Sequence, residues 1–130
     1  MAQKTAYKTP RGRAIGLGAA GSGVHHWWVT RVESVALIPL GLLFVFPFAS
    51  ALGEGHAAVL AVYQNWFNAV IAVLFIAVSF HHLMLGLQVV VEDYTHHKGW
   101  RTGLLIANQM FCAFFGLAGV FAVLKIALAG

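Results

Sequence analysis

The residues best suited to chemistry form one stripe along an apolar stretch of the chain. Steps of three or four residues separate them, and a helix places such residues on one face: Ser79, His82, Gly86, Val89 and Asp93. An ionisable side chain at membrane depth is costly, and it marks a functional site by default. Imidazole is a common axial ligand of haem iron, so His82 is the candidate haem ligand. The alternative is a neutral His82 hydrogen-bonded to a neighbouring helix.

The other histidines bear on how a haem would be held. His81 points about 100° away from His82 on a helix, which favours a packed or hydrogen-bonded side chain. Spacing alone does not exclude His81 as the ligand. The remaining five fall outside the apolar centre of any segment: His25, His26, His56, His96 and His97. If a haem has two axial histidines, the second therefore comes from another chain.

Asp93 and Tyr94 mark the place where the same apolar stretch meets water. At 1.5 Å per residue, Tyr94 lies roughly 18 Å along a helix from His82. A tyrosine hydroxyl can donate a hydrogen bond to a quinone carbonyl, and a carboxylate beside it can orient the phenol or relay protons. The alternative is an ordinary interfacial tyrosine beside an acidic residue that flanks the helix.

Two charged residues lie close to the start of the first apolar segment. Arg31 could extend to lipid headgroups, or it could pair with a buried carboxylate such as a haem propionate. Glu33 could pair with Arg31, pair with a cation of a partner chain, or be protonated. The sequence leaves these alternatives open.

Three apolar segments must carry these residues, at 32–52, 67–91 and 102–128. Each exceeds the roughly 20 residues that a membrane-spanning helix needs. The 130 residues are 60% hydrophobic and 9% charged, whereas soluble domains carry about 25% charged residues. We therefore predict an all-α membrane protein of one domain, residues 1–130, with three transmembrane helices and a basic, glycine-rich arm at 1–24.

Basic residues predict the orientation. Lys4, Lys8, Arg11 and Arg13 lie in the arm, and more basic residues follow the second segment, whereas residues 53–65 contain none. The N-terminus is therefore expected inside and the C-terminus outside.

The glycines at 16–21 match the dinucleotide-binding pattern G-x-G-x-x-G. They follow no predicted strand, so the match does not indicate a nucleotide site.

Cys112 is the only cysteine, and one thiol cannot hold an iron–sulfur cluster. It lies with small residues on one surface of the third segment, where helix backbones can approach closely. Packing within the chain and contact with another chain are equally compatible with that surface.

The sequence resembles a known family in two places. Gly23-Val24-His25, followed by Arg31, is similar to the start of the hydrophobic membrane anchors of bacterial succinate dehydrogenases. Residues 82–94 are similar to the family pattern H-x-x-x-G-x-x-x-V-x-x-D-Y, with His82 first and Tyr94 last. The resemblance covers nearly the whole chain. Glu33 departs from the family, which usually has an apolar or small residue there.

The resemblance implies a role for each matching residue. It makes His82 the axial ligand of a b-type haem, places Arg31 and His25 near the haem propionates and quinone pocket, and assigns ubiquinone contacts to Tyr94 and Asp93. It also implies partners: a sister membrane anchor that shares the haem, an iron–sulfur protein and a flavoprotein, in contact with membrane lipid and without nucleic acid. The chain would not be catalytic alone.

The implied location is the inner, cytoplasmic membrane of a bacterium rather than that of a mitochondrion. Two alternative functions remain at this point. One is the anchor of a menaquinol:fumarate reductase, and the other is a small membrane protein without redox function.

Overall fold

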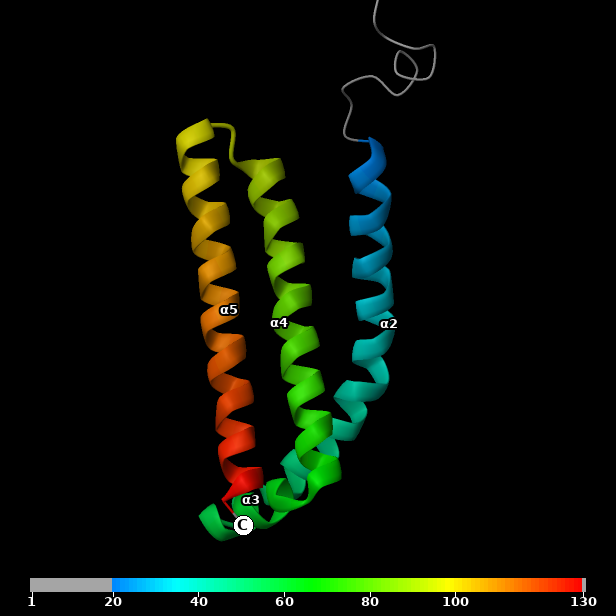
Figure 1. The fold of residues 1–130 in the computed structure, drawn as a ribbon, viewed down its shortest axis with the longest axis vertical. Helices are drawn as coiled ribbons and strands as arrows, with labels where there is room; N and C mark the ends of the chain where they lie inside the picture. Colours follow the sequence, from blue (N-terminus) through cyan, green and yellow to red (C-terminus); the bar gives the residue numbers. More distant parts are fainter. Residues whose placement is uncertain (1–19, 130) are drawn as a thin grey trace, which may run out of the picture.

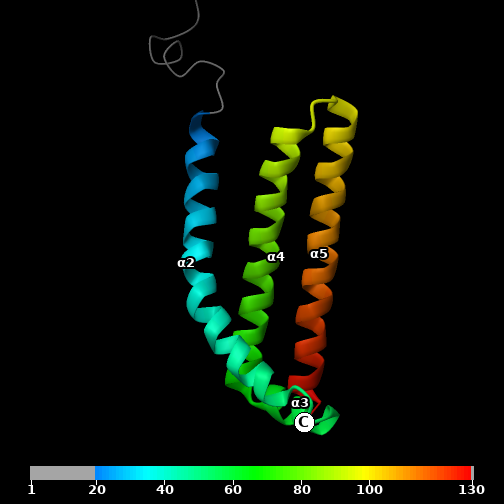
Figure 2. The same ribbon diagram turned by 180° about the vertical axis from the view of Figure 1, so that it is seen from behind.

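Three long helices and one short helix make up the part of the chain that the structure describes. The computed structural model describes residues 20–129, with helices α2 (Ala20–Ala51), α3 (His56–Gln64), α4 (Trp66–Tyr94) and α5 (Lys98–Leu128). In the figures α2 runs down, α4 runs up and α5 runs down, with α4 between α2 and α5 in both views (Figures 1 and 2). The start of α2 and the α4–α5 connection lie at one end of the molecule, and α3 and the end of α5 lie at the other.

The predicted all-helical class with three membrane-spanning helices is confirmed. Gly23–Ala51, Trp66–Tyr94 and Lys98–Leu128 are long and apolar enough to cross a membrane. A helix of 29 residues is roughly 44 Å long, which exceeds the hydrocarbon core of about 30 Å. Each long helix begins before the apolar segment that predicted it, and α4 also ends later than its segment. The basic cluster at 4–13 and the glycine motif at 16–21 lie largely outside the described residues.

Local interactions explain where the helices begin and turn. Gly53 and Gly55 have φ of 84° and 86°, a left-handed conformation that suits glycine and separates α2 from α3. The Asn65 side chain accepts hydrogen bonds from the backbone N–H groups of Phe67 and Asn68, which caps α4. His97 caps α5 in the same way by accepting from Trp100 N–H. Figure 1 shows α2 bent in its second half, the half that contains Pro39 and Pro47.

Small residues bring α5 close to α4. A Cβ built on Gly116 would lie 3.2 Å from Phe80 Cβ, and one on Gly119 would lie 3.1 Å from Ile76 Cγ2. The small-residue surface of α5 therefore serves packing within the chain at these two positions. Asn108 adds a polar link by donating from Nδ2 to the Met84 carbonyl oxygen at 2.9 Å. This bond fixes α5 against the part of α4 that carries His82.

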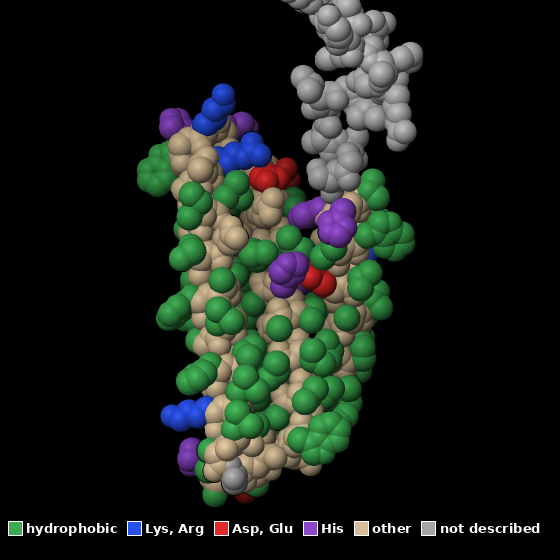
Figure 3. Space-filling view, in the orientation of Figure 1, with side chains coloured by type: hydrophobic (Ala, Val, Ile, Leu, Met, Phe, Trp, Pro, Cys, Tyr) green, Lys and Arg blue, Asp and Glu red, His purple; other side chains and the backbone are tan. Residues whose placement is uncertain are grey.

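Most of the apolar surface is left for other molecules to cover. Only 6–11% of the most hydrophobic window of each long helix is buried within the chain. Figure 3 shows hydrophobic side chains over most of the visible face, with most lysines and arginines near the two ends. A histidine and an acidic side chain lie together within that apolar surface. Lipid, or helices of a partner, must cover surface of this size and polarity.

Replacing Gly116 by leucine is expected to separate α4 from α5. The new side chain would overlap Phe80, and overpacking of this kind typically costs about 1–3 kcal/mol. Thermal unfolding of the purified protein measures the loss. Gly103→Leu is the matched control, because nothing lies within 4 Å of a Cβ on Gly103. Equal stability of the two variants would contradict the close α4–α5 packing.

Candidate functional site

A cavity of about 550 Å³ opens between the first half of α2 and the second half of α4. Its volume falls within the range of ligand-binding pockets, roughly 300–1,000 Å³. From α2 it is lined by residues spaced mostly three or four apart: Gly23, His26, Trp27, Thr30, Arg31 and Ser34. From α4 it is lined by His82 and Val89, two turns apart on the predicted stripe. The structure thus brings His82 and Arg31 to one cavity.

The α2 side of this cavity contains the Arg31 cation and two hydroxyl groups that are hydrogen-bonded to the backbone of α2. The guanidinium carbon of Arg31 lies 5.5 Å from the centre of the Trp27 ring, an arrangement in which the ring attracts the cation. Thr30 Oγ1 donates to the His26 carbonyl at 2.9 Å, and Ser34 Oγ donates to the Thr30 carbonyl at 2.8 Å. These back-bonds satisfy both hydroxyls within the helix. Arg31 is therefore the principal charge presented to the cavity.

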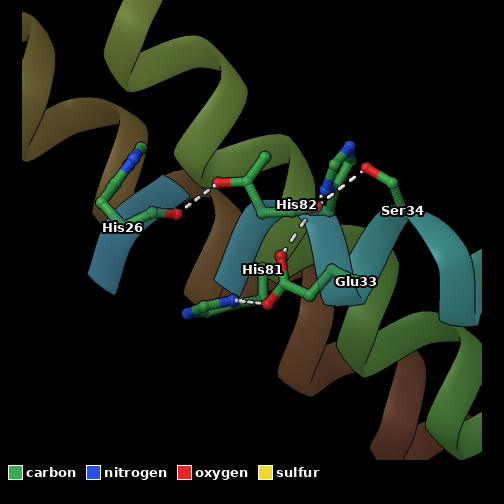
Figure 4. Close-up of polar contacts among 6 residues, drawn as sticks. His26, Glu33, Ser34, His81 and His82 are labelled. Atoms are coloured by element: carbon green, nitrogen blue, oxygen red, sulfur yellow. Dashed lines mark hydrogen bonds and ion pairs between the residues drawn. The ribbon is translucent and has the colours of Figure 1, made fainter. Parts of the chain in front are cut away.

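Glu33 contacts both adjacent histidines of α4, as Figure 4 shows. One carboxylate oxygen, Oε1, is hydrogen-bonded to His81 Nδ1. The other, Oε2, lies 3.5 Å from His82 Nδ1. The Glu33 side chain is 15% exposed, so its carboxylate is held largely by these two imidazoles.

Of the alternatives that the sequence left open for Glu33, pairing with Arg31 is not observed, because the partners of Glu33 among the described residues are His81 and His82. Arg31 and Glu33 are two positions apart on α2, and such residues do not face each other on a helix. Within residues 20–129, no group of three or more histidine, cysteine or carboxylate side chains is arranged to hold a metal ion. Within the Glu33–His81–His82 group, Glu33 is hydrogen-bonded to His81 and lies within ion-pair distance of His82.

His81 and His82 face different cavities. His81 lines a separate, mostly apolar cavity of about 230 Å³ between α4 and α5, with Phe80, Met84 and Gly116 among its neighbours. That cavity contains no cation from the described residues. His82 lines the cavity that contains Arg31. The 100° between successive helical residues therefore separates the two imidazoles into different surroundings.

The histidine at the start of α2 that lines the cavity is His26 rather than His25. His26 Nε2 is buried and has no hydrogen-bond partner among the described residues, while the His25 side chain is exposed and outside the cavity lining. Sequence reasoning attached no site role to His26. The spacing His26–Thr30–Arg31, all on the face of α2 that meets α4, is the signal that could have identified it.

Asp93 and Tyr94 lie at the end of α4, and both are exposed. Tyr94 is 81% exposed. Neither lines the cavity of His82 and Arg31. Gln88 Nε2 donates to Glu92 Oε1 at 3.0 Å, so these two polar residues that precede Asp93 are hydrogen-bonded to each other. The chain therefore presents the Tyr94 hydroxyl to a surrounding membrane surface or partner.

Comparison with known proteins matches the chain to one family. The model of the family described as "Succinate dehydrogenase/Fumarate reductase transmembrane subunit" matches residues 5–117. A succinate dehydrogenase hydrophobic membrane anchor subunit of Paracoccus denitrificans is 34% identical over 122 residues, which cover 94% of each chain. One from Rickettsia conorii is 33% identical over 101 residues, or 77% of this chain and 80% of the relative. No solved structure matches the chain.

Proposed function

The chain belongs to the family of succinate dehydrogenase/fumarate reductase transmembrane subunits, and on that premise we propose that it anchors a succinate dehydrogenase in the membrane. The named relatives support succinate dehydrogenase over fumarate reductase, because each is named as a succinate dehydrogenase anchor subunit. The chain would hold soluble flavin and iron–sulfur subunits at the inner membrane of a bacterium. The observation that carries its redox role is the cavity shared by His82 and Arg31.

The residues around this cavity fit a b-type haem. His82 turns Nδ1 toward Glu33, which leaves Nε2 as the nitrogen available to iron. The cavity offers a mostly uncharged wall together with one guanidinium, Arg31, and a haem likewise combines an apolar macrocycle with propionate carboxylates. We assign His82 as the axial ligand because it lines the cavity that contains Arg31, whereas His81 lines a separate cavity with no cation from the described residues.

Arg31 and His26 are the residues placed to hold the propionates. A guanidinium can bind a carboxylate through two parallel hydrogen bonds. His26 Nε2 is buried without a partner among the described residues, and such a group needs one, because leaving it unsatisfied is costly. His26 thus takes the propionate role that the family resemblance had given to His25, which remains free to contact quinone or another protein of the complex.

A haem bound here would supply one-electron transfer within the membrane. His82 would orient it, Arg31 and His26 would fix its propionate edge, and a second chain would complete the cavity and supply the other axial ligand. This sharing agrees with the large apolar surface that the long helices leave uncovered. The partners are thus a second membrane anchor and the two soluble subunits.

Tyr94 and Asp93 are proposed to contribute to quinone reduction at the end of α4. The Tyr94 side chain is exposed, so its hydroxyl can donate to a quinone carbonyl in a pocket completed by another protein of the complex. Asp93 precedes it and can orient the phenol or relay a proton. Ubiquinone is the expected substrate, on the basis of the family resemblance.

Copurification tests the anchoring role. A tag at the C-terminus of this chain, expressed in its native host, is expected to recover a flavoprotein, an iron–sulfur protein and a second anchor. The recovered complex is expected to oxidise succinate and to show the reduced absorption bands of haem b. Recovery of this chain without a flavoprotein would contradict the proposal.

The proposed topology makes a separate prediction. With the N-terminus inside, a periplasmic reporter fused after Gly130 is expected to be active, and one inserted at Lys98 is expected to be inactive. Lys98 lies at the α4–α5 connection and Gly130 follows the opposite end of α5, so the two reporters sample opposite sides. The reverse pattern would place Tyr94 on the side away from the soluble subunits.

A further inference from the structure

Glu33 is the one acidic side chain within the apolar part of a described membrane-spanning helix, and the anchoring role does not explain it. A carboxylate at that depth is expensive unless it has partners. Its partners are the two imidazoles of α4. They lie 48 and 49 positions further along the chain (82 − 33 = 49), so only the packing of α2 on α4 brings the three together.

Two atoms in this group lack a hydrogen bond. Glu33 Oε2 and His82 Nδ1 are both buried, and neither has a partner among the described residues. They lie 3.5 Å apart, just beyond the usual N–H···O distance of about 2.7–3.2 Å. Buried polar groups are almost always paired. A small rotation of either side chain would pair these two atoms with each other.

The other oxygen of Glu33 is held independently. Its hydrogen bond with His81 Nδ1 anchors Oε1, so the carboxylate is constrained at one oxygen while the other faces His82. Because adjacent helical residues diverge by about 100°, the two imidazoles approach the carboxylate from different directions. This arrangement limits rotation of Glu33 and directs Oε2 at His82 Nδ1.

We propose that Glu33 is a positioning residue for His82, held in place by His81. This inference rests on the proposed role of His82 as a haem ligand. Metal-bound histidines commonly donate their other ring N–H to a carboxylate, which fixes the tautomer and ring orientation and makes the imidazole a stronger donor. Glu33 would keep the proton on Nδ1 and Nε2 free for iron. A stronger donor favours ferric over ferrous iron, so Glu33 lowers the midpoint potential of the haem.

Glu33→Gln in the complete, purified complex tests the inference. The amide keeps the shape of the side chain but removes the charge. We expect wild-type haem content, a higher midpoint potential in a spectroscopic redox titration, and altered g-values of the ferric haem in electron paramagnetic resonance. Glu54→Gln is the charge-matched control, since Glu54 lies in the α2–α3 turn at the other end of the molecule. It is expected to leave the potential and g-values unchanged.

Wild-type potential and g-values in Glu33→Gln would overturn the inference. If Glu33→Gln loses haem, Glu33→Asp becomes the deciding variant: recovery of haem with an altered potential supports a positioning carboxylate, and failure to recover haem overturns it. His81→Ala is expected to retain haem and to raise the potential by less than Glu33→Gln does. A wild-type complex without haem would instead refute the proposed function, before any Glu33 variant is considered.

Discussion

Replacing His82 by alanine, in a chain expressed with its partner subunits, is expected to abolish or strongly alter the b-type absorption bands of the complex. The substitution removes the imidazole that lines the cavity between α2 and α4 and that we propose as an axial ligand of haem iron. The reduced-minus-oxidised spectrum of purified membranes measures the loss. Succinate oxidation with a soluble dye is expected to persist wherever the subunits still assemble, because we propose that the flavin lies on another protein of the complex.

His81→Ala is the matched control for this experiment. It removes an imidazole from the preceding position of the same helix, which also contacts Glu33 but faces a different cavity. We expect the haem bands to remain. Loss of the bands in His81→Ala, with retention in His82→Ala, would move the ligand to His81. Retention in both variants would exclude this chain from haem ligation.

Replacing Tyr94 by phenylalanine is expected to lower succinate:quinone activity by roughly tenfold or more. Loss of one hydrogen bond that leaves a buried partner unsatisfied costs about 1–3 kcal/mol, and each ~1.4 kcal/mol of barrier is a factor of ten in rate. Steady-state assays with a soluble ubiquinone analogue measure the effect. Haem content is expected to persist, since His82 lies roughly 18 Å away along α4.

Tyr63→Phe controls for the loss of a phenol elsewhere in the chain. Tyr63 lies in α3, at the opposite end of the molecule from Tyr94, and its loss is expected to leave quinone activity unchanged. Electron transfer from succinate to a soluble dye is expected to stay normal in both variants. If Tyr94→Phe lowers dye and quinone activities equally, Tyr94 supports assembly. If it lowers neither, Tyr94 is an ordinary interfacial tyrosine.

Hydropathy was sufficient to predict the helical class and the three spans, because a membrane demands about 20 apolar residues per helix. It could not predict where the helices end. α2 begins at Ala20 rather than near Val32, since backbone hydrogen bonds continue past the edge of the hydrocarbon core. α3 was missed, because it lies within 53–65, between the first and second predicted segments. It is only nine residues long, and a short apolar run between turns has no clear periodicity.

The α4 side of the candidate site could be predicted from residue types and from their depth in the membrane. The stripe on α4 placed His82 and Val89 on one face, and both line the cavity. Whether His26 or His25 lines the cavity depends on how α2 is rotated about its axis relative to α4. Contacts such as that between Phe44 and Phe75, whose ring centres are 4.6 Å apart, determine this rotation. The contact between Glu33 and His81 depends on the same packing across 48 positions. No local pattern encodes either feature.

The most direct test of the central claim is a cryo-EM structure of the complex purified through this chain. We predict a haem between α2 and α4, with its iron bound by His82 Nε2 and, on the opposite face, by a ligand from a second membrane anchor. Arg31 is predicted to contact a propionate. A complex in which no haem contacts this chain, or in which its iron is bound by His81, would contradict the account.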